Sequence, residues 1–504
     1  MSYRLIIKDA FWQILGRIFS ALAGFVVIKL ITPYLGPLRY GDYTTILKYF
    51  ALWSALADFG IYVIALKKLG ELKSNWDLLK EYLQKYVGAR LALIIVVYTI
   101  ALVVAYFIPS YSSNPFLVIG LPIGMIFSSL FMFAGISQLP LQLNWKMEHL
   151  SISLIWARII QIISIGLIVY YLFPHPDFNT PNLYAIYAFL WILIATLLSA
   201  LSQFLYVWYQ SNKLINFRPN IDLTFIKNLI IQNWQYGLAF FLSSFHMLSV
   251  TILLSIFFPT VKGFNYVGIW ALALALVEIV LIIPTALGNS LLHKIGSYTK
   301  EHKRKILGNF LIISVWIGLA IFLNYWLFAP LWIKVISGHK YLSVFLNWIG
   351  SDTILPFLGI VLILSYIKQV FNYIFISFEK QNILLHVNLS GIILGLSIWT
   401  VLILKYNLFG GIITQILLEL LFVGWWIFWA GKQKILPLVP NQYIKEILLL
   451  AALIMIWGIL FTIQGWPYKF IDISFASIGI LIGTNLAYIL FSFPFAKKWA
   501  KWLN

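Results

Sequence analysis

The chain has no cysteine, and acidic residues occupy only 16 of its 504 positions. Without cysteine it forms no disulfide, thiolate metal site or cysteine nucleophile, although the redox compartment stays open. The sequence also lacks a GxxxxGK(S/T) phosphate loop, a His/Cys/Asp cluster with metal-ligand spacing and a Ser–His–Asp arrangement. We therefore expect no catalytic residue, no bound metal and no cofactor, and we do not expect an enzyme.

Apolar residues, by contrast, are abundant. Hydrophobic residues make up 62% of the chain and charged residues 10%, and the mean hydropathy is +0.92. Soluble domains are about 45–50% apolar and about 25% charged, so this composition indicates a polytopic membrane protein with membrane lipids as partners. The net charge is +19, but the basic residues are scattered between apolar runs. We therefore expect no nucleic-acid partner.

A membrane-spanning helix needs about 20 mostly apolar residues, and the sequence offers fourteen such stretches. It therefore predicts an all-α polytopic membrane protein with 14 transmembrane helices. The first six are expected near residues 10–32, 43–66, 88–108, 114–143, 150–173 and 184–209. The next six are expected near 230–258, 267–292, 305–333, 351–379, 383–404 and 408–430, and the last two near 444–463 and 472–493.

Most of the 35 lysines and arginines fall in loops on the same side as the N-terminus when the spans alternate. Positive residues collect in cytoplasmic loops, so we expect both termini in the cytoplasm. No loop is long enough to hold a soluble catalytic domain. The longest inner loop, 67–87, predicts an amphipathic helix on the inner surface, with an apolar face of Leu69, Leu72, Trp76, Leu79, Leu83 and Tyr86.

A weak internal repeat divides the chain. Trp12-Gln13 recurs 222 residues later as Trp234-Gln235, and Gly41 recurs at the same offset as Gly263. Six spans separate the copies, so the repeat would be parallel. We expect an N-lobe at 1–220, a C-lobe at 221–435, and two further spans with a cytoplasmic tail at 436–504.

Charged residues inside the spans are the main candidates for function, because such residues are costly and rare at membrane depth. The cations are Arg17, Lys29, Lys48, Arg90, Arg158 and Lys368, and the deep acids are Asp58, Glu278 and Glu419. Some long side chains can extend to the membrane surface. We expect this of Arg90, leave it open for Arg158, and consider Lys368 too deep for it.

Depth along neighbouring spans predicts partners for some of these charges. Arg17 and Asp58 lie 20 residues before and 21 residues after Pro37, so we expect them to form a mainly structural ion pair. Lys29 and Lys48 also have matched depth, with only Asp42 as a nearby acid. Either an anion, a lipid headgroup or a water-filled cavity compensates these two lysines, or both reach the outer interface.

In the second half of the chain, Lys368, Glu278 and Glu419 fall near the middle of their spans. They could form one internally satisfied network, which we favour. Alternatively, Glu278 and Glu419, together with Asp58 of the first half, are candidates for coupling transport to H⁺ or Na⁺.

Three segments resemble a known family. TPYLGPLRYGDY (32–43), FFPTVKGFNYVGIWALAL (257–274) and PLWIKVISGHKY (330–341) are similar to segments of the Wzx-type polysaccharide flippases of the MOP superfamily, related to MurJ and the MATE exporters. The resemblance implies two six-helix lobes that form a V-shaped central cavity, plus two C-terminal helices. It also implies a cationic cavity that receives the pyrophosphate and sugars of a lipid-linked oligosaccharide.

From this resemblance we expect a plasma (inner) membrane flippase that moves a polyprenyl-pyrophosphate-linked oligosaccharide outward by alternating access. The resemblance puts Arg17, Lys29 and Lys48 forward as substrate-binding residues, and Arg158 and Lys368, two further cations within the spans, are added as candidates without a matching family motif. Glycan polymerases or glycosyltransferases of the same pathway are expected partners. Two alternatives stay open, namely a MATE-like exporter of drugs or metabolites and a polytopic glycan polymerase or ligase.

Overall fold

The structure, a computed structural model, describes residues 3–72, 75–258, 261–295, 298–378, 380–465 and 479–490, with the single residues 467, 477 and 492. Throughout these residues every regular element is a helix, which confirms the predicted all-α class. The chain divides into two compact units, 1–268 and 269–504, and each is described by itself. The boundary lies beyond residue 220, and the predicted division into lobes stays a prediction.

Within the described residues, ten helices are long and apolar enough to cross a membrane. Two of them, α1 (Tyr3–Asp58) and α16 (Gln381–Lys432), each consist of two helical segments joined at a kink. The backbone angles are non-helical at Gly36 in α1 and at Asn407 in α16. Each half corresponds to one predicted span. The shorter apolar helices Leu248–Phe257 and Gly479–Leu490 correspond to predicted spans 7 and 14. The count of fourteen itself stays a prediction, and the tail after residue 492 lies outside the described residues.

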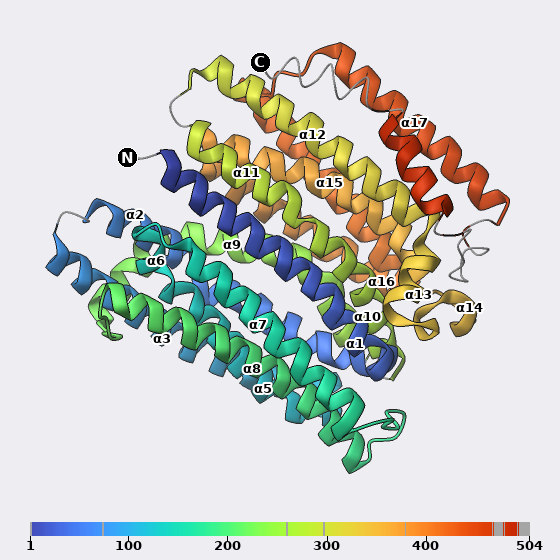
Figure 1. Cartoon of the computed structure of the whole chain (residues 1–504), viewed down its shortest axis with the longest axis horizontal. Coiled ribbons are helices and arrows are strands. Elements are labelled where there is room, and N and C mark those ends of the chain that lie inside the picture. The colour runs from blue at the N-terminus through green and yellow to red at the C-terminus, as the bar shows by residue number, and fades with distance from the viewer. Residues whose placement is uncertain are drawn as a thin grey trace. The chain divides into compact units, whose positions relative to one another are not determined.

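Unit 1 is a bundle of long helices. α1 packs along α7 (Met147–Leu167) and α9 (Leu223–Phe257), and α5 (Pro115–Ser137) packs on α8 (Leu183–Leu214). α7 and α8 also pack on each other, and Figure 1 shows α5, α7 and α8 side by side. A one-turn π-helix, η1 (Ile168–Leu172), extends α7. α3 (Trp76–Phe107) contacts both α1 and α5, and the short α4 (Pro109–Ser112) follows it.

The predicted inner end of unit 1 has a hydrophobic core of its own. It joins α2 (Ile61–Glu71), the start of α3, α6 (Leu139–Leu143) and the start of α9. The expected amphipathic face is buried here at Leu79 and Leu83, whereas Trp76 is 54% exposed. At 1.5 Å per residue, the 32 residues of α3 extend about 48 Å, beyond a hydrocarbon layer of about 30 Å. The part of the amphipathic segment from Trp76 on is therefore the first part of a long membrane helix rather than a separate element, and the part up to Glu71 ends α2.

Unit 2 contains a second bundle. α15 (Ser351–Ser377) packs between α12 (Lys300–Leu327) and α16, and α17 (Asn441–Ile463) packs on α12. α10 (Val261–Val280) contains the boundary between the units, and α11 (Ile282–Ile295) follows it and packs on α15. Short elements connect α12 to α15, namely α13 (Ala329–Ser337), η2 (His339–Tyr341) and α14 (Ser343–Leu346).

One packing detail occurs in both units and supports the internal repeat. In unit 1 the backbone N–H of Asn220 donates to the carbonyl of Gln84, and in unit 2 that of Leu438 donates to Arg304, both at 3.0 Å. The two acceptors are 220 residues apart, close to the offset of 222 in the sequence. The glycine four residues after each acceptor leaves no room for a Cβ beside the incoming backbone. Each unit therefore fastens the segment that follows one long helix, α8 or α16, to an earlier helix, α3 or α12, in the same way.

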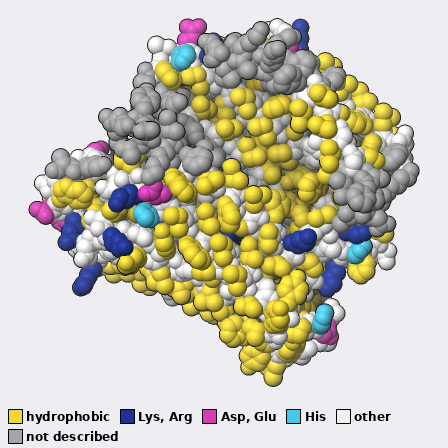
Figure 2. All heavy atoms as spheres, viewed as in Figure 1, with side chains coloured by type: hydrophobic (Ala, Val, Ile, Leu, Met, Phe, Trp, Pro, Cys, Tyr) yellow, Lys and Arg dark blue, Asp and Glu magenta, His cyan; other side chains and the backbone are white. Residues whose placement is uncertain are grey.

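The described surface is that of a membrane protein. Hydrophobic side chains cover most of the face in Figure 2, and the few charged side chains lie mainly toward its margins. On α3, for example, Ile95, Val96, Ile100 and Val103 are all exposed. Exposed side chains of this kind along a membrane helix are expected to contact lipid.

Candidate functional site

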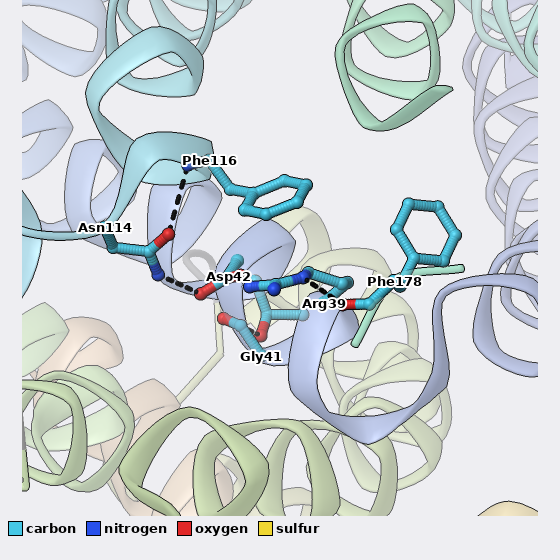
Figure 3. A network of polar contacts seen from close by, with 7 residues as sticks. Arg39, Gly41, Asp42, Asn114, Phe116 and Phe178 are labelled. Atoms are coloured by element: carbon cyan, nitrogen blue, oxygen red, sulfur yellow. Dashed lines mark hydrogen bonds and ion pairs between the residues drawn. The ribbon is translucent and has the colours of Figure 1, made fainter. Parts of the chain in front are cut away.

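Arg39 is the centre of a buried polar network near the kink in α1 (Figure 3). Its Nη1 donates to Asp42 Oδ2 at 2.8 Å, and its Nε donates to the carbonyl of Phe178 at 3.0 Å. The guanidinium lies over the ring of Phe116, 3.7 Å from the centroid. Asn114 donates to Asp42 Oδ1 at 2.7 Å and accepts from the backbone N–H of Phe116. The network thus ties α1, the start of α5 and the loop after η1 together.

This network provides partners for Asp42, the only acid that the sequence placed near Lys29 and Lys48. Asp42 is fully buried, and both of its carboxylate oxygens accept hydrogen bonds. A buried carboxylate with an arginine partner is already compensated. Arg39 lies between the predicted spans 10–32 and 43–66, and the sequence pattern did not predict this network. The spacing of three residues between Arg39 and Asp42 is the signal that could have revealed it.

Asp58 pairs with Arg90 of α3, and this corrects two expectations. Nη1 of Arg90 donates to Asp58 Oδ1 and also to the backbone carbonyl of Asp58, the latter at 3.1 Å. The predicted pair with Arg17 does not form, because Asp58 ends α1 at the level where α3 presents a closer cation. Arg90 does not extend into solvent either, since it is buried against this acid.

Arg158 of α7 is partly buried, and its hydrogen-bond partners among the described residues are neutral. Its Nε donates to Ser20 Oγ of α1 at 3.2 Å, and its Nη1 donates to Gln161 Oε1 at 2.8 Å. Arg158 can contact Ser20 because α1 and α7 pack closely, with Gly16 of α1 directly against Ser151 of α7. Ser20 is three residues after Arg17 on the same helix, so Arg17 and Ser20 occupy neighbouring positions on the helix surface.

The other predicted cations of unit 1 differ in their environments. Arg17 is partly buried and Lys29 is exposed, and neither makes a hydrogen bond or an ion pair in the part of the chain that the structure describes. Lys48 is partly buried and has an interaction of its own. Arg17 and Lys29 are both on the first half of α1, about 18 Å apart along its axis at 1.5 Å per residue.

In unit 2, two members of the predicted network meet. Nζ of Lys368 on α15 lies 2.6 Å from Oε1 of Glu419 on α16, and Ser365 donates to the same oxygen at 3.2 Å. Glu419 is fully buried, whereas Lys368 keeps part of its side chain exposed and lies near the ring of Phe422. Glu278 is partly buried and takes part in an interaction of its own.

Together these contacts leave a surplus of positive charge in unit 1. The acids Asp42 and Asp58 are matched by Arg39 and Arg90. In the described residues, Arg17, Lys29 and Arg158 then have no carboxylate partner. A cation in a medium of low dielectric constant attracts an anion strongly. The arrangement is therefore suited to binding a negatively charged group.

Comparison with known proteins gives one family. The model of the family described as polysaccharide biosynthesis protein matches residues 6–292, more than half of the chain. A search among curated proteins finds no match.

Solved structures show the fold. The structure of the lipid II flippase MurJ in an inward closed conformation aligns with a TM-score of 0.68 at 16% identity, covering 97% of this chain and 99% of that one. A MATE family multidrug resistance transporter of the MOP superfamily aligns in its inward-facing conformation with a TM-score of 0.64 at 14% identity, covering 83% and 95%. A structure of a MATE family multidrug resistance transporter of the MOP superfamily in an outward-facing conformation gives a TM-score of 0.60 at 14% identity, covering 86% and 95%.

Proposed function

Because the chain belongs to the polysaccharide biosynthesis protein family, we propose that it moves a polyprenyl-pyrophosphate-linked oligosaccharide from the inner to the outer leaflet. The resemblance found in the sequence is confirmed, and the chain is a multi-pass membrane protein with the fold of MurJ and MATE transporters. The cargo would be an O-antigen, capsule or exopolysaccharide repeat unit. The route would be alternating access in the plasma (inner) membrane, with both termini in the cytoplasm.

The observation that carries this proposal is the surplus of positive charge in unit 1. Arg39 and Arg90 match Asp42 and Asp58, and within the described residues Arg158 makes its hydrogen bonds to Ser20 and Gln161. A pyrophosphate carries several negative charges and many acceptor oxygens, so it suits guanidinium and ammonium donors. The lipid tail carries no charge, whereas the pyrophosphate is present whatever the glycan, and we therefore assign the cations to the pyrophosphate.

Transbilayer movement of a labelled lipid-linked oligosaccharide in proteoliposomes tests the proposal. Arg158→Gln and Lys29→Gln should each slow flipping by roughly tenfold or more, the factor expected for one lost charged hydrogen bond. Replacing Lys29 and Lys48 together with Gln should abolish flipping while the chain stays folded and inserted. Lys80→Gln is the control, because Lys80 is exposed at the start of α3. Unchanged flipping by the double variant would remove the two lysines from the substrate site.

Competing cargo separates this function from drug export. A polyprenyl pyrophosphate without sugar should inhibit flipping, and the corresponding monophosphate should inhibit it less, because it presents less charge to the cations. A cationic dye should neither inhibit flipping nor be exported. Export of the dye, with no effect of the pyrophosphate, would favour a MATE-like exporter instead.

Coupling to H⁺ or Na⁺ is a separate part of the proposal. Asp58 and Glu419 are each paired with a cation, Arg90 and Lys368. This pairing favours structural roles for the two acids, and it also makes Lys368 a weaker candidate for the substrate. Imposing a proton or a sodium gradient across the proteoliposome would reveal coupling. A rate that neither gradient changes would argue against it.

The chain is further proposed to lack enzymatic activity and a cofactor. The family and the fold are those of transporters, which supports this view. Mass spectrometry of the lipid-linked oligosaccharide recovered from proteoliposomes should show an unchanged glycan. A longer or transferred glycan would point to a polymerase or ligase. Co-purification with a glycosyltransferase or polymerase acting on the same lipid-linked glycan would test the proposed partners.

A further inference from the structure

Span 2 is interrupted in unit 1. α1 ends at Asp58, α2 begins at Ile61, and the two residues between them, Phe59 and Gly60, have φ values of +47° and +71°. An L-residue such as Phe59 rarely takes this left-handed conformation, so the surroundings must hold it there. The ring of Phe59 lies against Gly237 of α9, where a Cβ would be 2.7 Å from it.

Span 8 is interrupted in unit 2 at the corresponding place. α10 ends at Val280 and α11 begins at Ile282, and Val280 is 222 residues after Asp58, the offset of the repeat. The cause here is Pro284, which has no N–H and whose ring displaces the carbonyl four residues earlier, that of Val280. Two different local sequences thus interrupt a helix at one position of the repeat.

In both units another helix supplies the missing donor. Arg90 Nη1 of α3 donates to the carbonyl of Asp58 at 3.1 Å, and Tyr366 Oη of α15 donates to the carbonyl of Val280 at 2.7 Å. In unit 2 a second hydroxyl of α15, that of Tyr373, donates to the carbonyl of Thr285 at 3.0 Å, just after the proline. Each interruption is therefore satisfied by specific side chains.

We propose that these two interruptions are joints at which the inner ends of spans 2 and 8, α2 and α11, change direction during transport. The proposal rests on the alternating-access route of the proposed function. An interrupted helix can bend at a few residues while the rest keeps its packing, which is how hinges work in other proteins. Arg90 and Tyr366 hold the joints in the bend observed. The 21 residues from Pro37 to Asp58 span about 31 Å at 1.5 Å per residue, which places the unit 1 joint near the inner membrane surface.

The absence of native cysteine allows paired spin labels in the full chain, reconstituted in lipid nanodiscs. In unit 2, labels at Leu287 of α11 and Phe357 of α15, both exposed, would report the angle of the joint. Tyr366→Phe should change the ratio of the distance populations roughly fivefold, the factor carried by one ordinary hydrogen bond.

Tyr325→Phe is the matched control, because Tyr325 donates at 2.9 Å to the carbonyl of Leu276 within the uninterrupted part of α10. It should leave the distance distribution unchanged. No shift with Tyr366→Phe, or an equal shift with Tyr325→Phe, would overturn the joint in unit 2.

In unit 1, labels at Ala51 and Glu71 flank the other joint. Gly60→Ala disfavours the left-handed conformation, so the distance should lengthen toward the roughly 30 Å of a continuous helix. Gly70→Ala is the control, because Gly70 has open space around it, and it should cause no shift. An unchanged distance with Gly60→Ala would overturn this joint. Shifted distances in a chain that flips no lipid-linked glycan would instead overturn the proposed function and leave the joints standing.

Discussion

Arg90 binds Asp58 at two points, the carboxylate and the backbone carbonyl, with the same guanidinium nitrogen. Asp58 ends α1, where the helix dipole places partial negative charge and disfavours an acid. The cation of α3 offsets that charge and satisfies a carbonyl that the interrupted helix leaves without a donor. This explains why an acid is tolerated at this helix end.

A double-mutant cycle should distinguish this pair from the pair that the sequence predicted. Asp58→Asn combined with Arg90→Gln should show a coupling energy of roughly 1–3 kcal/mol, because the two side chains share one buried contact. Asp58→Asn combined with Arg17→Gln should show a coupling near zero. Thermal unfolding in detergent micelles gives both values. A larger coupling with Arg17 would contradict the structure.

Arg39→Lys should destabilise the chain although it keeps the charge. The guanidinium donates to Asp42 and to the carbonyl of Phe178 while lying flat on Phe116. An ammonium group cannot do all three, so we expect a loss of roughly 1–3 kcal/mol, as for a buried group left unsatisfied. The comparison is Arg218→Lys, at an exposed position after α8, which should unfold at the wild-type temperature. Equal midpoints for the two variants would count against the network.

Asp222 should make the chain less stable in acid. Its carboxylate caps α9 by accepting the backbone N–H of Phe225 at 2.9 Å, and Lys85 lies 3.6 Å away. The hydrogen bond first, and then the nearby lysine, lower the pKa of Asp222 below its usual value. A carboxyl with a lowered pKa in the folded state stabilises that state above the unfolded pKa near 3.8. This contribution is lost as the pH falls through the lower, folded value.

Asp222→Asn isolates this effect, because asparagine also caps helices but does not titrate. Over roughly pH 3 to 5, the range around the ordinary aspartate pKa, the unfolding midpoint should fall less steeply in the variant than in the wild type. Lys80→Gln, which removes a nearby exposed charge, should keep the wild-type slope. Parallel slopes for wild type and Asp222→Asn would show that the cap does not depend on charge.

The sequence predicted the helices well, because apolar runs of span length have few alternatives in a membrane. It predicted the partners of the charges less well. Depth counted from a turn brought Arg17 and Asp58 to one level, but depth does not say which neighbouring helix faces the acid. The contact with Arg90 depends on how α1 and α3 pack, and a single chain's pattern does not contain that information. Lys368 and Glu419 were grouped correctly, since both lie near the middle of their spans and few polar partners exist there.

The interruptions of spans 2 and 8 illustrate the same limit. Pro284 is visible in the sequence and is a known cause of bends. The left-handed conformation of Phe59 is not visible in the sequence, because it depends on packing in the folded unit, where the ring lies against Gly237. The local sequence therefore predicts the interruption of span 8 but not the corresponding interruption of span 2.

The reciprocal contact of Asn324 on α12 and Asn485 gives the last prediction. Each side-chain amide donates to the carbonyl oxygen of the other, at 2.8 and 3.0 Å. Amides that pair between helices in a membrane contribute about 0.6–2 kcal/mol. Asn324→Leu should therefore lower the unfolding midpoint, because it leaves the amide of Asn485 in apolar surroundings.

Replacing both residues with leucine should restore much of that loss, since no polar group is then left unmatched. The hydroxyl of Tyr488, which donates to the carbonyl of Trp316 at 2.7 Å, would still hold the last helix to α12. Unfolding of the two single variants and the double variant in detergent measures this directly. If the double variant were as unstable as the sum of the singles, the two amides would act independently and the pair would not be what fastens this helix.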